Sequence, residues 1–148
     1  MFGTFHIDLQ RYPARVQAPV LEVLFESWVK LNAVYLLAHP STPRLYQSGV
    51  IYRRESPEVW KDIPSIIEDG CDDCEGLACW LAAELRTRDK ITGAKVRLAE
   101  QHTTTRRRLW HAIVFDPLSK RVWDPSRALG MGGPNDRPAT RKGRVKCR

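Results

Sequence analysis

The nine residues Gly70-Cys71-Asp72-Asp73-Cys74-Glu75-Gly76-Leu77-Ala78 are the most informative part of this chain. They place a cysteine, Cys74, at the point where an amphipathic helix begins. Apolar residues share one face of that helix, at offsets of 3, 4, 7 and 11 from the cysteine: Leu77, Ala78, Leu81 and Leu85. Acidic residues come first and basic residues last, which suits the helix dipole. The pattern predicts a helix over residues 73–88, with Asp72 or Asp73 as its N-cap.

Three short segments downstream of this helix have the pattern of β-strands. Residues 94–99 alternate between apolar and polar side chains, and residues 109–115 and 121–124 are mostly apolar. The last two segments can form a hairpin, because the loop between them contains Pro117, which suits the second position of a type I turn. Together with the helices, these strands predict an α+β domain in which the Cys74 helix packs on a small antiparallel sheet.

The hairpin would bring His111 and Asp124 together. If Phe115 pairs with Lys120 across a four-residue loop, His111 lies directly opposite Asp124. Side chains opposed in this way have Cβ atoms about 4.5–5.5 Å apart. A register shifted by one residue would place them on opposite faces of the sheet. We therefore expect a carboxylate beside the imidazole.

A thiol, an imidazole and a carboxylate are the parts of an activated cysteine nucleophile. A helix N-terminus and a neighbouring imidazolium both lower the pKa of a cysteine, and Cys74 has the first of these by position. His111 would act as the general base, and Asp124 would fix the orientation and tautomer of its ring. The backbone N–H of Cys74 can donate to a developing oxyanion. Acidic neighbours that disfavour a thiolate are also present: Asp72, Asp73 and Glu75.

The cysteines also allow two other interpretations. Cys71-x-x-Cys74 has the spacing of a thioredoxin-like redox pair, although the strand expected before such a pair is not evident. The same cysteines could bind zinc with Cys79, His102 or His111 as further ligands. The second close ligand pair that is typical of zinc sites is missing, however. Catalysis by a cysteine is therefore favoured, with no metal and no cofactor expected.

Composition predicts one soluble globular domain. The chain has 148 residues, of which 43% are hydrophobic and 28% charged. Four cysteines are too few for a disulfide scaffold, so we expect reduced thiols, with Cys79 used in packing and Cys147 incidental. The first residues show no signal-peptide pattern, and charged residues interrupt the apolar region 18–38. A cytoplasmic location with no membrane partner is expected.

The net charge of +7 is concentrated in two places. One is Arg106-Arg107-Arg108, and the other is the tail from Arg137 to Arg148, which has basic but no acidic residues. Such segments are either solvated or in contact with nucleic acid or an acidic protein surface. No motif for sequence-specific nucleic-acid recognition accompanies them.

The sequence divides into three parts. Residues 1–17 are predicted to be irregular, residues 18–131 to form a single domain, and residues 132–148 to form a basic, flexible tail. Within the domain, a helical stripe begins at Pro19 and ends near His39.

Two segments between this helix and Cys74 have weaker patterns. Residues 45–54 are interpreted as an extended, partly buried segment. Residues 58–68 are interpreted as a short helical piece that Pro64 breaks.

Three motifs together resemble the transglutaminase-like cysteine enzymes. They are Asp73-Cys74-Glu75-Gly76-Leu77-Ala78, then Trp110-His111-Ala112, then Trp123-Asp124-Pro125-Ser126. The resemblance covers residues 45–131. It extends, more loosely, to small versions encoded among bacteriophage structural genes, through the lead-in at residues 45–52 and the Trp60-Lys61-Asp62-Ile63-Pro64 stretch.

The resemblance implies a papain-like core in which a nucleophile-bearing helix packs on an antiparallel sheet. By position, Cys74 is the nucleophile, His111 the general base and Asp124 the orienting acid. The implied function is cysteine-dependent acyl transfer: hydrolysis of a peptide or peptidoglycan-like amide, or, less favoured, cross-linking of proteins. The family often has Gly-Asp-Cys where this chain has Cys71-Asp72-Asp73-Cys74. For a second oxyanion donor, Tyr52 and Trp60 are the candidates.

The alternative function belongs to another class, in which this chain uses the same fold as a scaffold and not for catalysis. The chain would then be a bacteriophage virion structural or assembly protein, such as a head or tail component. Its basic C-terminal tail would dock on another structural protein or an acidic surface, and its location would be the virion rather than the cytoplasm of a bacterial host.

Overall fold

A computed structural model describes residues 8–55, 59–101 and 109–133. The expectations for His102, Cys147, Arg106-Arg107-Arg108 and the tail from residue 134 lie outside these ranges.

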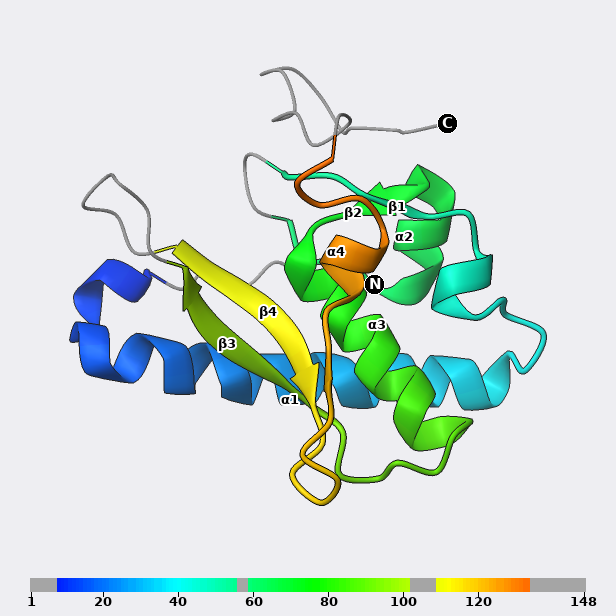
Figure 1. The fold of residues 1–148 in the computed structure, drawn as a ribbon, viewed down its shortest axis with the longest axis horizontal. Coiled ribbons are helices and arrows are strands. Elements are labelled where there is room, and N and C mark those ends of the chain that lie inside the picture. Colours follow the sequence, from blue (N-terminus) through cyan, green and yellow to red (C-terminus); the bar gives the residue numbers. More distant parts are fainter. Residues whose placement is uncertain (1–7, 56–58, 102–108, 134–148) are drawn as a thin grey trace.

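The described residues form a mixed α+β structure (Figure 1). The helices, including two short 3₁₀ turns, are η1 (Leu9–Arg11), α1 (Ala14–Ala38), η2 (Leu45–Gln47), α2 (Ile63–Asp69), α3 (Cys74–Thr87) and α4 (Pro125–Ala128). The strands are β1 (Ile51–Tyr52), β2 (Cys71–Asp72), β3 (Lys95–Gln101), β4 (Leu109–Phe115) and β5 (Val122–Trp123). None of the helices in the described ranges combines the length and hydropathy that a membrane-spanning helix requires.

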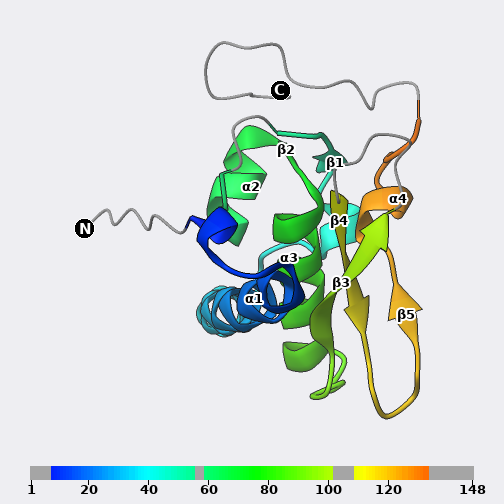
Figure 2. The same cartoon turned by 90° about the vertical axis from the view of Figure 1, so that its left-hand side faces the viewer.

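Helix α3 is the centre of the fold. It lies between α1 and the antiparallel sheet β3-β4-β5, as Figure 2 shows. The prediction of a helix over residues 73–88 is confirmed to within one residue at each end. Almost every side chain of α3 is buried, because both of its sides are covered. The core around it includes Phe25 and Val29 from α1, Leu77 and Trp80 from α3, and Ala112 and Val114 from β4.

Helix α1 begins five residues earlier than the sequence predicts. Pro13 is the N-cap residue, with an extended backbone, and the helix starts at Ala14. Pro19 therefore lies inside the helix, where it has no N–H to donate to the carbonyl of Arg15 one turn earlier. The assignment of residues 14–17 to an irregular segment is wrong.

The β4–β5 hairpin has a different register from the predicted one. Phe115 pairs with Val122 rather than with Lys120. The reason is the loop: the Asp116 N–H donates to the Arg121 carbonyl at 2.9 Å, so the four-residue loop closes one position later. The Asp116 carboxylate accepts from backbone N–H groups inside the loop, and Lys120 adopts a left-handed φ of 60°. Each residue of β4 is therefore paired two residues further along β5 than predicted. Because this shift is an even number, each side chain stays on the predicted face of the sheet.

A second, parallel pair of strands was not predicted. β1 and β2 pair in parallel, with α2 as the connection between them. Pro64 begins α2 rather than breaking it, because the helix starts at Ile63 and the Asp62 carboxylate accepts from the Ser65 N–H at 3.1 Å. Gly70 ends α2 with a φ of 75°. β2 ends at Asp72, two residues before Cys74, so this pair of strands fixes the position at which α3 begins.

Candidate functional site

Cys74 is the first residue of α3, and Asp73 is the N-cap residue before it. Its side chain is buried, with 9% of the residue exposed. The thiol is within hydrogen-bonding reach of the backbone of Ala112, the residue that follows His111 on β4. The N–H of Cys74, at the first turn of α3, has no acceptor inside the helix. A thiol and an amide donor with no acceptor inside its own helix thus lie together where α3 meets β4.

His111 and Asp124 are in contact, as the sequence predicts. The imidazole Nε2 lies 2.9 Å from Asp124 Oδ2, and only 5% of His111 is exposed. Asp124 follows the end of β5 and caps α4, because its Oδ1 accepts the Arg127 N–H at 3.1 Å. The Arg127 guanidinium also lies 3.2 Å from Oδ2. Asp124 is therefore held by both His111 and Arg127. Since Nε2 of the imidazole contacts Asp124, Nδ1 is the nitrogen that could act on a substrate or on the thiol.

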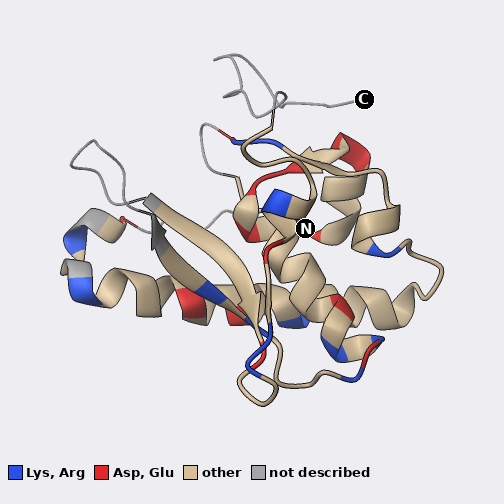
Figure 3. Cartoon of the chain, viewed as in Figure 1, with Lys and Arg blue, Asp and Glu red and all other residues tan. Residues whose placement is uncertain are grey.

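The environment of the thiol differs from the predicted one. Burial raises the pKa of Cys74, and the carboxylates of Glu75 and Asp73 raise it further. Glu75 Oε2 accepts from Sγ at 3.2 Å. The hydrogen bond with the Ala112 backbone acts in the opposite direction but is weaker than burial. Acidic residues gather in the chain at the N-terminal end of α3 (Figure 3). The resting thiol is therefore neutral, in contrast to the lowered pKa expected from the helix terminus alone.

Asp73 and Glu75 form a carboxyl pair beside the thiol. Burial, followed by the hydrogen bond and charge of Glu75, raises the pKa of Asp73 from 3.8 to about 9. Asp73 occupies the N-cap position but makes no side-chain cap hydrogen bond. The pair therefore holds a proton at neutral pH that the unfolded chain does not hold.

Replacing Asp73 by asparagine is expected to flatten the pH dependence of stability. In the wild type, the free energy of unfolding falls as pH rises between about 4 and 9, by at most about 1.4 kcal/mol per pH unit for one proton. The sign follows because, in this window, the folded state keeps a proton that the unfolded state has already released. Rising pH therefore favours the unfolded state until the folded state also loses its proton near pH 9. Urea denaturation at several pH values measures the slope.

The matched control for this experiment is Asp89→Asn. Arg44 lowers the pKa of Asp89, so its contribution to stability is lost only on acidification, and its replacement leaves the slope above about pH 5 unchanged. Equal slopes for the wild type and Asp73→Asn between about pH 5 and pH 9 would contradict the assigned proton.

A buried lysine anchors the segment that leads to Cys74, and sequence reasoning missed it. The Lys61 ammonium lies 3.3 Å from Asp72 and 3.4 Å from Asp69, and it also contacts Glu55. Burial raises the pKa of Asp72 well above its usual value, with Asp73 adding to the effect. No local pattern marks a lysine for burial, since its partners come from other parts of the chain.

The redox and zinc interpretations find no support in the described residues. Cys74 and Cys79 are free, whereas Cys71 is disulfide-bonded, so Cys71 and Cys74 are not paired with each other. The expectation of a reduced thiol is wrong for Cys71. Within the described ranges, no group of three His, Cys, Asp or Glu side chains is arranged to hold a metal ion. Cys79 is fully buried in the core, as expected.

The two candidates for a second oxyanion donor, Trp60 and Tyr52, make the following contacts. The Trp60 ring packs against Phe25 at 4.9 Å and Trp28 at 5.9 Å. Tyr52 is buried on β1, and its N–H donates to the Leu129 carbonyl. Tyr46 was not predicted to lie near the site. Burial raises the pKa of its hydroxyl, and so do the charges of Glu84 and Asp124.

No protein-family model, curated protein or solved structure matches this chain. The fold and the site therefore define the protein by geometry: an α+β domain with a buried cysteine at a helix N-terminus, a histidine on β4 and an aspartate just after β5 that contacts it.

Proposed function

We propose that the chain is a cysteine-dependent acyl-transfer enzyme that hydrolyses a peptide or peptidoglycan-like amide, built on a transglutaminase-like core. One observation carries the proposal. His111 Nε2 contacts Asp124 at 2.9 Å, and the next residue of the same strand, Ala112, contacts the Cys74 thiol through its backbone. A buried imidazole with one nitrogen bound to a carboxylate is an oriented base.

Each residue has a defined part in the proposed reaction. As Sγ of Cys74 forms a bond to the substrate carbonyl carbon, its proton moves to Nδ1 of His111. The Cys74 N–H stabilises the oxyanion. The imidazolium then gives the proton to the leaving amine as the C–N bond breaks, leaving a thioester. His111 next removes a proton from water, which attacks the thioester and releases the acid and the thiol. Because the resting thiol is neutral, proton transfer accompanies attack rather than preceding it.

The proposal is tested with p-nitrophenyl acetate, which needs no knowledge of the natural substrate. Sγ displaces p-nitrophenolate and becomes acetylated, and peptide mass analysis locates the acetyl group. We expect one acetyl group on Cys74 and none on Cys79, which is buried in the core. Cys74→Ser should abolish the burst of p-nitrophenolate. Acetylation spread over lysines, with Cys74 unmodified, would sink the proposed function.

Glu75→Gln is expected to make Cys74 more reactive. Removing this carboxylate lowers the pKa of the thiol, so alkylation by iodoacetamide near neutral pH should rise roughly tenfold. Glu68→Gln on α2 removes the same charge from a carboxylate that does not act on the pKa of the thiol, and it should leave the rate unchanged. An unaltered rate in Glu75→Gln would show that burial alone sets the pKa.

A second candidate function, an assembly protein of a virion, is favoured by α1. Its outward face exposes four apolar side chains, each between 49% and 69% exposed: Val23, Leu31, Val34 and Leu37. In that function, replacing Val34 and Leu37 by aspartate would prevent copurification with assembled particles, whereas Cys74→Ala would have no effect. The opposite pattern would exclude it.

A further inference from the structure

A cavity of about 360 Å³ is lined by residues of η2, α3 and β5 and of the loops next to them. Its apolar lining includes Tyr46, Leu81, Leu85, Ile91 and Trp123. Trp123 directly precedes Asp124, and the hydroxyl of Tyr46 is within electrostatic reach of Asp124. The cavity is thus adjacent to the site described above but uses none of its three central residues.

The cavity also lies on the Cys74 face of α3. Leu81 and Leu85 are 7 and 11 residues after Cys74 on the same helical stripe. At 1.5 Å per residue, they lie about 10–16 Å along the helix from the thiol. An extended peptide advances about 3.3 Å per residue, so three to five residues would span this distance.

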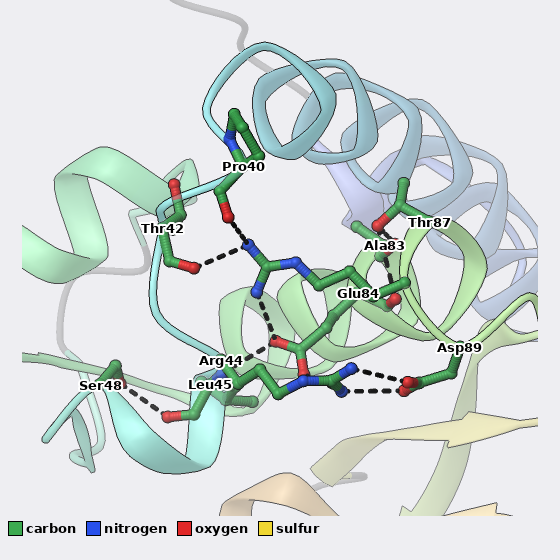
Figure 4. A network of polar contacts seen from close by, with 10 residues as sticks. Pro40, Thr42, Arg44, Leu45, Ser48, Ala83, Glu84, Thr87 and Asp89 are labelled. Atoms are coloured by element: carbon green, nitrogen blue, oxygen red, sulfur yellow. Dashed lines mark hydrogen bonds and ion pairs between the residues drawn. The ribbon is translucent and has the colours of Figure 1, made fainter.

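The charged residues of the cavity lining are Arg44, Glu84, Asp89 and Arg121, and the first three are paired with one another. The Arg44 guanidinium is already paired within the lining: it donates to Glu84 at 3.1 Å and to both oxygens of Asp89, as Figure 4 shows. Arg88, which is not part of the lining, lies 3.9 Å from Glu84 on its other side and donates to the Thr42 carbonyl at 2.7 Å. Both carboxylates of the lining therefore already have arginine partners other than Arg121.

Arg121 is the cation that remains. Among the described residues, no carboxylate lies within ion-pair distance of it; instead its guanidinium lies over the Trp123 ring, 4.9 Å from the ring centroid. A guanidinium held over an aromatic ring still has N–H donors that can bind a planar anion. An aromatic platform therefore holds a cation at the rim of an apolar cavity.

We propose that this cavity binds a peptide segment in which a carboxylate lies next to an aromatic or aliphatic side chain. Arg121 pairs with the carboxylate, and Tyr46, Leu81 and Trp123 contact the apolar group. The binding itself does not require catalysis. Its assignment as the part of the substrate three to five residues from the reacting amide rests on the proposed function.

The probe is N-acetylphenylalanine, compared with its neutral isostere N-acetylphenylalaninamide. Binding is followed in the full chain carrying Cys74→Ser, by NMR of the Trp123 indole N–H, which Trp123→Phe identifies. We expect a saturable shift with a millimolar dissociation constant for the acid, and affinity for the amide lower by roughly threefold to tenfold.

Arg121→Gln should weaken binding of the acid to the level of the amide, whereas Arg97→Gln, an exposed arginine on β3, should leave it unchanged. Equal binding of acid and amide, no effect of Arg121→Gln, or no saturable shift would each overturn the assignment. The two proposals fail separately: binding without acetylation of Cys74 refutes only the enzyme, and acetylation without binding refutes only this site.

Discussion

Replacing His111 by alanine is expected to slow acetylation of Cys74 by p-nitrophenyl acetate by about 10²–10⁴-fold. The reason is the neutral resting thiol. Since burial and two carboxylates raise the pKa of Cys74, attack depends on a base that takes the proton as the bond forms. The burst of p-nitrophenolate measures the rate, and thermal unfolding shows whether the variant remains folded.

Asp124→Asn separates the contact with His111 from the cap of α4. Asparagine has a single acceptor oxygen, which can replace Oδ1 and accept the Arg127 N–H, so α4 should be preserved. Its NH₂ group then faces Nε2 in place of Oδ2, so the carboxylate contact with His111 is lost while the imidazole remains. The variant should therefore fold normally and lose less activity than His111→Ala. Asp124→Ala removes both the hydrogen bond to His111 and the cap of α4, so it should lose more activity and about 1 kcal/mol of stability. If His111→Ala were as active as the wild type, the imidazole would not be the base.

The elements of the site could be predicted because their signals are local. The stripe that follows Cys74 is periodic over more than three turns, and α3 begins where that pattern begins. The contact of His111 with Asp124 was predicted from an incorrect register. It is present because the true register differs by two positions, which keeps a side chain on the same face of the sheet.

The electrostatics of the site could not be predicted in the same way. A helix N-terminus lowers the pKa of a thiol, but burial and neighbouring carboxylates raise it, and at Cys74 these two effects are the larger ones. Burial of Cys74 depends on the packing of α3 between α1 and β4, and the position of Glu75 depends on that packing too. The parallel strands β1 and β2 were missed because each is two residues long, too short to show alternation.

Gly76→Ala is expected to destabilise the fold by about 3 kcal/mol or to prevent folding, although alanine is the better helix former. A Cβ atom at Gly76 would lie 1.7 Å from Asp72 Oδ2 and 3.2 Å from Ile66 Cδ1. Asp72 cannot turn away without leaving Lys61, which lies 3.3 Å from its other oxygen. The absence of a side chain at Gly76 therefore leaves room for the Asp72 carboxylate to contact Lys61, and this contact positions the start of α3. Urea denaturation of the purified variant gives the free energy of unfolding.

A double-mutant cycle with Asp72→Ala distinguishes this contact from a general intolerance of the position. Asp72→Ala alone should destabilise the chain, since Lys61 then faces only Glu55 and Asp69. In that background the space beside residue 76 is open, so adding Gly76→Ala should cost nothing, or should stabilise by up to about 1 kcal/mol through helix propensity. If Gly76→Ala were equally harmful with and without the Asp72 carboxylate, the close approach of Asp72 would not be the reason for glycine at this position.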